Sequence, residues 1–199
     1  MTSYKQKLRQ DIWRLCEQVA VEQRQYDAAR AAKHFFQSGL LNKYQHIACY
    51  MSLPREMNTQ PLLKHIIDKR QQCYLPVIDK KHHGVMRFAI YRPGDCLITN
   101  KWGIAEPTND AEKIRTQDLD IIIMPLTAFD RQGNRLGSGA GYYDRTLAGI
   151  NHLQQRPVLC GYAYRFQQVE QLVPDDWDVP LDMVLTEQGI TIVRDNHSG

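Results

Sequence analysis

The residues best suited to chemistry lie between Asp130 and Arg145, where glycine, arginine, tyrosine and aspartate are concentrated. Four of the chain's 12 glycines fall between Gly133 and Gly141. Three of them alternate, directly after an apolar run and directly before a predicted helix. In such a loop the backbone N–H groups turn inward as an anion-binding nest, and the helix N-terminus adds a positive dipole. The segment therefore predicts a phosphate site.

Charged side chains flank these glycines. Arg135 and Arg145 could donate charged hydrogen bonds to phosphate, and Asp144 could hold a magnesium ion that bridges phosphate oxygens. The segment is not a P-loop, because the chain has no G-x-x-x-x-G-K-[ST], and Tyr142 breaks the dinucleotide fingerprint. A purely structural turn is the alternative, although such a turn needs one or two glycines rather than four. The residues favour an anion site without identifying the anion.

Helices and strands must position this loop. Helical spacing of apolar residues predicts a first helix over 4–19, and a second that starts with Asp27 as its N-cap and stops at Gly39. Thr59 and Pro61 mark the start of a third helix, and a short one is expected over 142–147. The predicted strands are 46–51, 72–77, 85–91, 119–125, 157–163, 182–186 and 190–193.

This alternation predicts the fold class, an α/β protein with one three-layer α/β/α domain and a mainly parallel central sheet. The β-branched run 119–125 is typical of a central strand that is buried on both faces. The sequence contains no internal repeat and no convincing linker. We therefore expect a single domain over residues 1–199.

Composition excludes several classes of protein. Of the 199 residues, 43% are hydrophobic and 24% are charged, which is globular usage rather than that of a disordered chain. The net charge of +3 comes from scattered residues and argues against nucleic-acid binding. No run approaches the roughly 18–20 apolar residues of a membrane helix, and residues 1–7 contain no apolar signal core. We expect no membrane and no nucleic-acid partner.

Cysteine usage points to a reducing compartment. The five cysteines form no C-x-x-C pair, so they predict neither a zinc ribbon nor a disulfide framework. Cys49, Cys73 and Cys160 lie in apolar runs, where each is expected to be a small buried hydrophobic residue. A cytoplasmic protein is the simplest interpretation.

The glycine loop belongs to the longest of six ordered blocks that extend along nearly the whole chain. These blocks are K-x-x-L-R (5–9), a strand-loop segment ending in E-x-x-T (50–59), G-I-x-E-P (103–107), M-P-L-T-A-F-D (124–130), G-x-R-L-G-x-G-x-G-Y-Y-D-R (133–145) and D-x-x-x-T-E (182–187). Together they resemble the 5-formyltetrahydrofolate cyclo-ligase (methenyltetrahydrofolate synthetase) family. The resemblance implies a three-layer α/β/α fold.

The resemblance also implies a reaction, in which ATP and magnesium drive conversion of 5-formyltetrahydrofolate to 5,10-methenyltetrahydrofolate with release of ADP and phosphate. Its implied ATP contacts are Lys5, Gln6, Lys7, Leu8, Arg9, Arg135, Leu136, Gly137, Ser138, Gly139, Ala140, Gly141, Tyr142 and Tyr143. Its implied folate contacts are Met51, Glu56, Ser138, Gly139, Ala140, Gly141 and Tyr142. Arg135 and Arg145 are the implied catalytic residues, and Asp144 and Asp182 the implied magnesium ligands. A cytoplasmic monomer acting on a small molecule is expected.

Other interpretations remain open. Without the resemblance, Lys5 and Arg9 are better explained as solvated surface charges, and Asp182 as a residue that starts a strand. Ser138 and Ala140 stand where family members often carry a basic residue, which would weaken one phosphate contact. Trp102 is expected in the core. A non-catalytic nucleotide- or phosphate-binding module is the alternative function, and a sugar-phosphate isomerase a further one.

Overall fold

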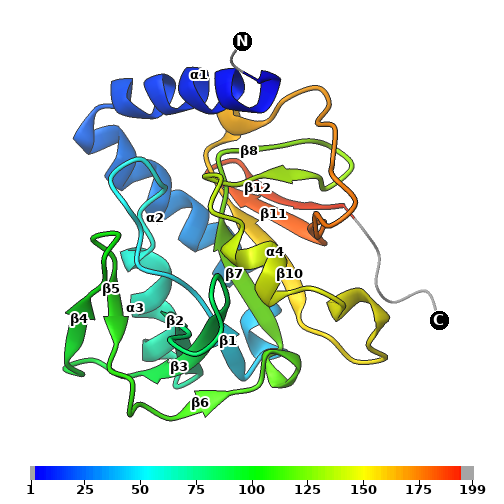
Figure 1. Ribbon diagram of the computed structural model, residues 1–199. Helices are drawn as coiled ribbons and strands as arrows, with labels where there is room; N and C mark the ends of the chain where they lie inside the picture. The colour runs from blue at the N-terminus through cyan, green and yellow to red at the C-terminus, as the bar shows by residue number, and fades with distance from the viewer. Residues whose placement is uncertain (1–2, 194–199) are drawn as a thin grey trace.

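The structure is a computed structural model that describes residues 3–193, apart from the side chain of Leu41 (Figure 1). Its helices are α1 (Tyr4–Gln18), α2 (Val21–Gln37), α3 (Gln60–Asp68) and α4 (Tyr142–Thr146), with short 3-10 turns η1 (Leu40–Asn42), η2 (Thr116–Asp118), η3 (Ile150–His152) and η4 (Arg165–Gln167). Its strands are β1 (His46–Ala48), β2 (Gln72–Ile78), β3 (Met86–Tyr91), β4 (Leu97–Thr99), β5 (Ala105–Pro107), β6 (Lys113–Ile114), β7 (Ile121–Pro125), β8 (Ala128–Phe129), β9 (Arg135–Leu136), β10 (Val158–Tyr162), β11 (Met183–Thr186) and β12 (Gly189–Ile192).

An eight-stranded sheet forms the centre of the molecule, in the order β12-β11-β10-β7-β1-β2-β3-β6. The inner strands β11, β10, β7, β1 and β2 are parallel, and β12, β3 and β6 pair antiparallel at the edges. Two small hairpins, β4-β5 and β8-β9, lie outside it. The predicted α/β fold with a mainly parallel sheet is confirmed.

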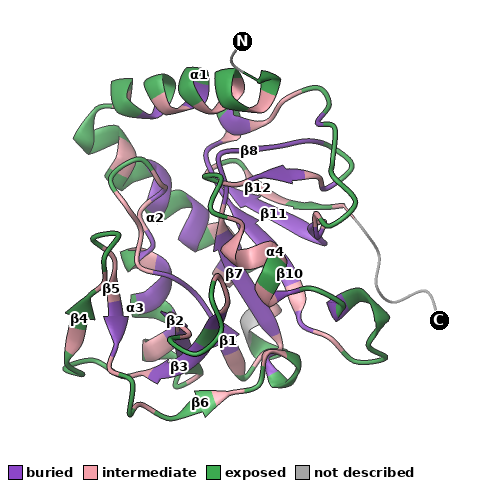
Figure 2. Ribbon diagram, in the orientation of Figure 1, coloured by how far each residue is buried: buried purple, intermediate pink, exposed green. Residues whose placement is uncertain are grey.

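Two hydrophobic clusters cover the two faces of this sheet, and strand β7 shows why. Ile121 and Ile123 belong to the cluster packed against α2 and α3, while Ile122 and Met124 belong to the cluster on the other face. Successive side chains of a strand point to opposite faces, so an all-apolar run is buried on both (Figure 2). The second helical layer is thin, because α4 has five residues and irregular segments complete it.

The sheet order also creates a crevice. From β1 the chain moves to β2 on one side, then returns through β7 on the other side of β1. The loops leaving the carboxyl ends of β1 and β7 therefore diverge, and open α/β sheets bind ligands at such a switch point. These loops are residues 49–59 and 126–141, which contain one of the six sequence blocks whole, most of a second and the start of a third.

Several sequence predictions need correction. Helix α2 begins at Val21, and Asp27 is not its N-cap but a buried residue inside it, where its carboxylate accepts a hydrogen bond from Gln23 Nε2 (2.8 Å). Thr59 precedes α3 as predicted, but its hydroxyl donates to the carbonyl of Tyr50 (2.7 Å) rather than capping the helix. Trp102 is 54% exposed, so the prediction of a core residue is wrong.

Other predictions are confirmed. Cys49, Cys73 and Cys160 are buried, and all five cysteines are free thiols. Among the helices of the described chain, none combines the length and apolar character that crossing a membrane requires.

Candidate active site

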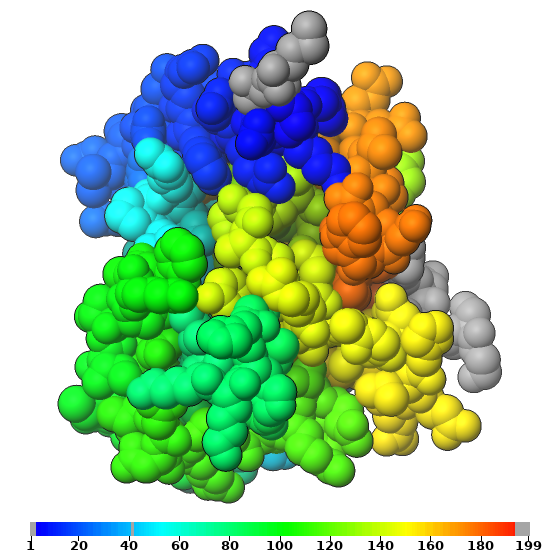
Figure 3. Space-filling view, viewed as in Figure 1, coloured from blue at the N-terminus to red at the C-terminus, as the bar shows by residue number. Residues whose placement is uncertain are grey.

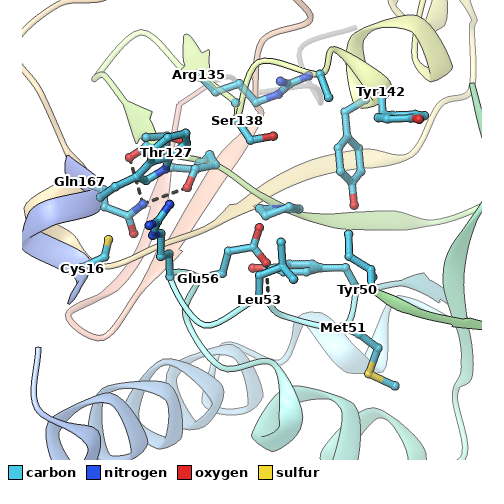
Figure 4. Close-up of a pocket in the computed structure, with 18 of the residues that line it drawn as sticks. Cys16, Tyr50, Met51, Leu53, Glu56, Thr127, Arg135, Ser138, Tyr142 and Gln167 are labelled. Atoms are coloured by element: carbon cyan, nitrogen blue, oxygen red, sulfur yellow. Dashed lines mark hydrogen bonds between the residues drawn. The ribbon is translucent and has the colours of Figure 1, made fainter. Parts of the chain in front are cut away.

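A cavity of about 670 Å³ opens at the carboxyl ends of β1 and β7. One wall is the loop after β1, which includes Tyr50, Met51 and Glu56, and the facing wall is the glycine loop with Arg135 (Figure 4). Residues of α1 and the start of α2 form a third side. The cavity therefore joins segments that lie far apart in the sequence.

The glycine loop is built by the β8-β9 hairpin and the turn into α4. Gly139 (φ 107°) and Gly141 (φ 66°) have left-handed backbones, which side chains with a Cβ rarely adopt. A Cβ on Gly141 would also lie 2.8 Å from the Arg145 guanidinium. Two of the three alternating glycines are thus required by geometry. The short α4 can add little helix dipole, so side-chain cations must supply most of the positive charge.

Helix α1 supplies one of these cations. Arg9 Nε donates to the carbonyl of Gly137 (2.8 Å), and its guanidinium lies against Gly139. Partial burial lowers the pKa of Arg9, and within the described chain its two Nη groups have no hydrogen-bond partner. A desolvated guanidinium with free donors is suited to an anionic ligand.

The neighbouring α1 residues lie differently. Lys5 is held by Asp175 (2.7 Å) and Asp178 (3.5 Å), both on the segment that leads to β11. Gln6 completes the capping box with Ser3, and Leu8 packs against a small apolar cluster. Of the predicted stretch 5–9, only Arg9 hydrogen-bonds to the glycine loop in the described chain.

Arg135 is buried and forms an ion pair with Asp144, from Nη2 to Oδ1 at 2.6 Å. The same Oδ1 accepts a hydrogen bond from the backbone N–H of Val179 (3.3 Å). Arg135 Nε is buried without a partner in the described chain, and Asp144 Oδ2 accepts no hydrogen bond there. One donor and one carboxylate oxygen thus remain available on this wall.

Arg145 lies outside the cavity. Its Nε donates to the carbonyl of Gly84 (2.9 Å), its Nη2 to that of Ala140, and the guanidinium stacks over the Tyr142 ring. These contacts stabilise the glycine loop from the side that faces away from the cavity. The structure therefore gives Arg145 a supporting position rather than a place beside the reacting groups.

Asp182 is not brought to Asp144. Its two oxygens accept from Arg156 (2.8 and 2.7 Å), and Oδ2 also accepts from the backbone N–H of Leu159 (2.8 Å). The residue lies just before β11, and it lines a second cavity instead of the first. Within residues 3–193 no group of three or more His, Cys, Asp and Glu side chains could hold a metal ion. The geometry gives no support to a magnesium site shared by Asp144 and Asp182.

Glu56 and Met51 line the cavity as predicted for a ligand-binding wall. Glu56 Oε2 accepts a hydrogen bond from the backbone N–H of Leu53 (2.8 Å). Burial raises the pKa of Glu56 to about 7, with that hydrogen bond acting in the opposite sense. A partly buried carboxyl group with a raised pKa on a cavity wall is a candidate for binding a polar ligand.

Sequence reasoning missed two residues of the cavity lining, Gln167 and Tyr50, and one neighbour of the lining, Trp102. Gln167 Nε2 donates to the carbonyls of Leu126 (2.9 Å) and Thr127 (3.0 Å), which holds the loop after β7. Tyr50 lines the cavity beside Glu56, and Trp102 Nε1 donates to the Tyr142 hydroxyl (3.3 Å). Only the aromatic type of Trp102 was a signal in the sequence. The other two act through contacts that no local pattern encodes.

Comparisons with known proteins agree with this geometry. A family model described as the 5-formyltetrahydrofolate cyclo-ligase family matches residues 1–187. The 5-formyltetrahydrofolate cyclo-ligase of Escherichia coli (strain K12) is 40% identical over 141 residues, covering 70% of this chain and 76% of that protein. The Haemophilus influenzae protein of the same name is 33% identical over 185 residues, covering 92% and 98%.

A solved structure shows the same fold. The NMR structure of Aquifex aeolicus 5,10-methenyltetrahydrofolate synthetase superposes with a TM-score of 0.82 at 28% identity, covering 99% of this chain and 96% of that one. The resemblance of the six sequence blocks is thereby confirmed over the whole fold. This chain belongs to the 5-formyltetrahydrofolate cyclo-ligase family, a family of ligases.

Proposed function

We propose that this enzyme cyclises 5-formyltetrahydrofolate to 5,10-methenyltetrahydrofolate, consuming ATP and releasing ADP and phosphate. The observation that carries the proposal is that one cavity has two unlike walls, with the Glu56 carboxyl group on one and the glycine loop with Arg135 on the other, while Arg9 hydrogen-bonds to this loop from outside the lining. Adjacent N–H donors on a pterin suit a carboxylate, and backbone amides with guanidinium groups suit phosphates. The names of the relatives support the same reaction.

The chemistry explains why both walls are needed. The formyl oxygen is a poor leaving group, so the γ-phosphoryl group of ATP is transferred to it, and ADP departs. The N10 lone pair then attacks the formyl carbon, the C–O bond breaks, and phosphate leaves with the bonding electrons. The N10 proton passes to solvent. Phosphoryl transfer depends mainly on positioning and charge neutralisation, so no side-chain nucleophile is required.

The glycine-loop wall holds the nucleotide in this proposal. The unpaired Nη groups of Arg9 and the buried Nε of Arg135 donate to phosphate oxygens, together with backbone amides of residues 137–141. Lys5 joins them once its ammonium leaves Asp175 and Asp178. Ser138 and Ala140 carry no charge, so Arg9 and Arg135 neutralise most of the phosphate charge.

A magnesium ion fits at Asp144. Its Oδ2 accepts no hydrogen bond in the described chain, and Mg²⁺ is commonly held by one or two carboxylates together with substrate phosphates and water. When bound there, the ion would neutralise charge on the phosphate oxygens. Arg135, paired to Oδ1, keeps the carboxylate oriented toward the cavity.

The folate occupies the opposite wall. Glu56 accepts hydrogen bonds from the amide and amino edge of the pterin, and Met51 provides apolar contact beside it. Tyr142 lines the cavity on the glycine-loop side, and Trp102, outside the lining, donates a hydrogen bond to the Tyr142 hydroxyl. We place the enzyme in the cytoplasm as a monomer, and the five free thiols support that location.

The test is a spectroscopic assay of the methenyl product with purified protein, 5-formyltetrahydrofolate, ATP and Mg²⁺, each omitted in turn. We expect absorbance of the product only when all are present. Asp144→Asn should raise the Mg²⁺ concentration needed for half-maximal rate. Asp118→Asn, in an exposed ion pair with Arg115 remote from the cavity, is the matched control.

Two results would contradict the proposal. Product formation without ATP would exclude phosphoryl activation of the formyl oxygen. ATP binding by calorimetry without any product would favour the alternative, a non-catalytic nucleotide-binding module.

A further inference from the structure

The buried Tyr50 and the partly buried Glu56 both lie on the folate wall of the cavity. Tyr50 follows the carboxyl end of β1 by two residues, and Glu56 comes six residues later on the same loop. Both side chains line the cavity (Figure 4). In the proposed reaction Glu56 binds the pterin, and the Tyr50 hydroxyl has no assigned role.

The Tyr50 hydroxyl is buried and has no hydrogen-bond partner within residues 3–193. The whole residue is only 3% exposed. Leaving such a donor unpaired in the interior is destabilising, so an unpaired hydroxyl calls for an explanation. Phenylalanine would fill the same space without that cost.

Glu56 is an acceptor with unused capacity. Its single hydrogen bond in the described chain comes from the backbone of Leu53, whereas an ionised carboxylate accepts about four. Burial raises the pKa of Tyr50, and the Glu56 carboxylate raises it further, so the two groups are near enough to interact. An unpaired donor and an unsatisfied acceptor are therefore neighbours.

The loop between them is held rigidly. Thr59 Oγ1 donates to the carbonyl of Tyr50 (2.7 Å), and Ser52 and Thr59 exchange side-chain to backbone hydrogen bonds (3.3 Å each). Glu56 N–H donates to the carbonyl of Leu53 (2.9 Å). A side-chain rotation, with no backbone movement, is then the simplest way to bring the hydroxyl to the carboxylate.

The other charged groups at the cavity are paired or lie on the facing wall, and the Tyr143 phenol is a second neighbour of Glu56, since burial and then the Glu56 carboxylate raise its pKa. The titratable and charged residues that line it with Glu56 are Cys16 and Glu17 from α1, Arg24 from α2, Tyr50 and Arg55 from the β1 loop, and Arg135, Tyr142, Tyr143 and Asp144 from the facing wall. Glu17 pairs with Arg55, Asp144 pairs with Arg135, and Arg24 donates to backbone carbonyls. Arg135 Nε, the other buried unpaired donor of this lining, is on the facing wall.

We propose that the Tyr50 hydroxyl donates a hydrogen bond to the Glu56 carboxylate in the folate-bound enzyme, so that Tyr50 is a positioning residue that keeps Glu56 ionised and aimed at the pterin. This inference rests on the proposed function, because it assigns the ligand of Glu56. Tyr50 itself needs no contact with the substrate.

The test compares Tyr50→Phe with wild type by calorimetric binding of 5-formyltetrahydrofolate from pH 5.5 to 8.5. We expect Kd at pH 7 to rise about tenfold, as for one lost hydrogen bond to a charged group. The defect should be full at high pH and shrink as the pH falls, because losing the donor raises the pKa of Glu56 only in the complex, where the protonated acid no longer needs that hydrogen bond. The melting temperature of the free protein should not fall, since no hydrogen bond is lost.

Tyr164→Phe is the matched control. Its hydroxyl is likewise buried and unpartnered, but Tyr164 does not line the cavity, so neither Kd nor the pH profile should change. In a Glu56→Gln background, Tyr50→Phe should have no further effect on the pH profile and little on Kd. An unchanged profile in Tyr50→Phe, or a full tenfold loss that persists in the Glu56→Gln background, would overturn the proposal.

Failure of the inference is distinct from failure of the proposed function. Absence of methenyl product from wild type with all substrates present would count against the function. Normal turnover by wild type, with Tyr50→Phe indistinguishable from it, would count against the inference alone.

Discussion

At the scale of single residues, the site contains a few groups whose conformation or burial is unfavourable for the stability of the fold. Gly139 has a left-handed backbone, Arg135 has a buried unpaired donor, and Glu56 is a partly buried acid. Strained backbone, unpaired buried donors and perturbed pKa values cluster at functional sites, where a bound ligand can supply the missing interactions. Two predictions follow from the backbone at Gly139 and from the burial of Glu56.

Gly139→Ala should lower stability by about 1–3 kcal/mol and raise the KM for ATP, because alanine is strained at a φ of 107°. Its new Cβ would also lie 3.6 Å from the Arg9 guanidinium. Thermal denaturation and initial rates at varied ATP test this. Gly137→Ala is the control, since its backbone is not left-handed and no atom lies within 4 Å of the added Cβ. Equal losses of stability in both variants would contradict the role of backbone conformation.

Glu56→Gln should stabilise the free protein at pH 8 and leave its stability unchanged near pH 4. The folded-state pKa of about 7 lies above the ordinary 4.5, so the folded protein binds more protons between these values. The stability contributed by the protonated acid is complete below pH 4.5 and is lost as pH rises to about 7. Melting curves at the two pH values measure the effect. The exposed Glu170→Gln should show no such dependence, and a stabilisation that is equal at both pH values would contradict the assignment.

At the scale of elements, α1 and the irregular segment 168–182 meet at the edge of the site. Lys5 pairs with Asp175 and Asp178 on this segment, and Figure 3 shows the two coloured regions in contact on the front of the molecule. The same segment reaches Asp144 through the N–H of Val179. Segment 168–182 therefore contacts two residues of the proposed nucleotide site, Lys5 and Asp144, although it lies outside the glycine loop.

Asp175→Asn should lower the KM for ATP, by roughly two- to fivefold, if Lys5 exchanges this carboxylate for a phosphate. The reason is that removing a competing anion frees the ammonium group. Initial rates at varied ATP measure it, with folate saturating. Asp68→Asn, in the exposed pair with Lys64, is the control and should leave both KM values unchanged. A higher KM for ATP in Asp175→Asn would mean that the carboxylate positions Lys5 instead.

At the scale of the whole molecule, the topology separates the reaction site from a structural ion pair. The cavity lies at the carboxyl ends of β1 and β7, whereas Asp182 and Arg156 lie at the start of β11 and just before β10. Both side chains of this pair are largely buried, with exposures of 3% and 15%. Its position and burial suggest a role in holding β10 against β11.

Asp182→Asn should reduce stability by about 3–5 kcal/mol, because it removes the negative charge from a largely buried ion pair with Arg156. The remaining folded protein should keep the Mg²⁺ dependence of wild type. Chemical denaturation and Mg²⁺ titration of activity test the two statements. The double variant Asp182→Leu/Arg156→Met should recover part of the stability. A raised Mg²⁺ requirement in Asp182→Asn, with normal stability, would restore Asp182 as a metal ligand.

Local patterns were sufficient for the fold class and for the glycine loop. The run 119–125 predicts β7 because burial on both faces leaves an uninterrupted apolar signature, and Gly139 and Gly141 answer a backbone requirement that lies within the loop. Asp27 shows the limit of such patterns. Aspartate is a favoured N-cap residue, but it is also accommodated inside a helix when a neighbouring side chain donates to its carboxylate, as Gln23 does to Asp27 one turn later.

Only the tertiary structure decided which of the chemically capable residues share a site. Arg9 hydrogen-bonds to Gly137, which is 128 residues away in the sequence, and Gln167 hydrogen-bonds to Thr127, 40 residues earlier. Asp182 forms an ion pair with Arg156 and does not line the cavity with Asp144. Residue type and spacing specify the chemistry that a side chain can perform and the helix or strand on which it lies. Which partner it meets follows from the strand order, because placing β7 beside β1 is what brings the Glu56 loop to the glycine loop.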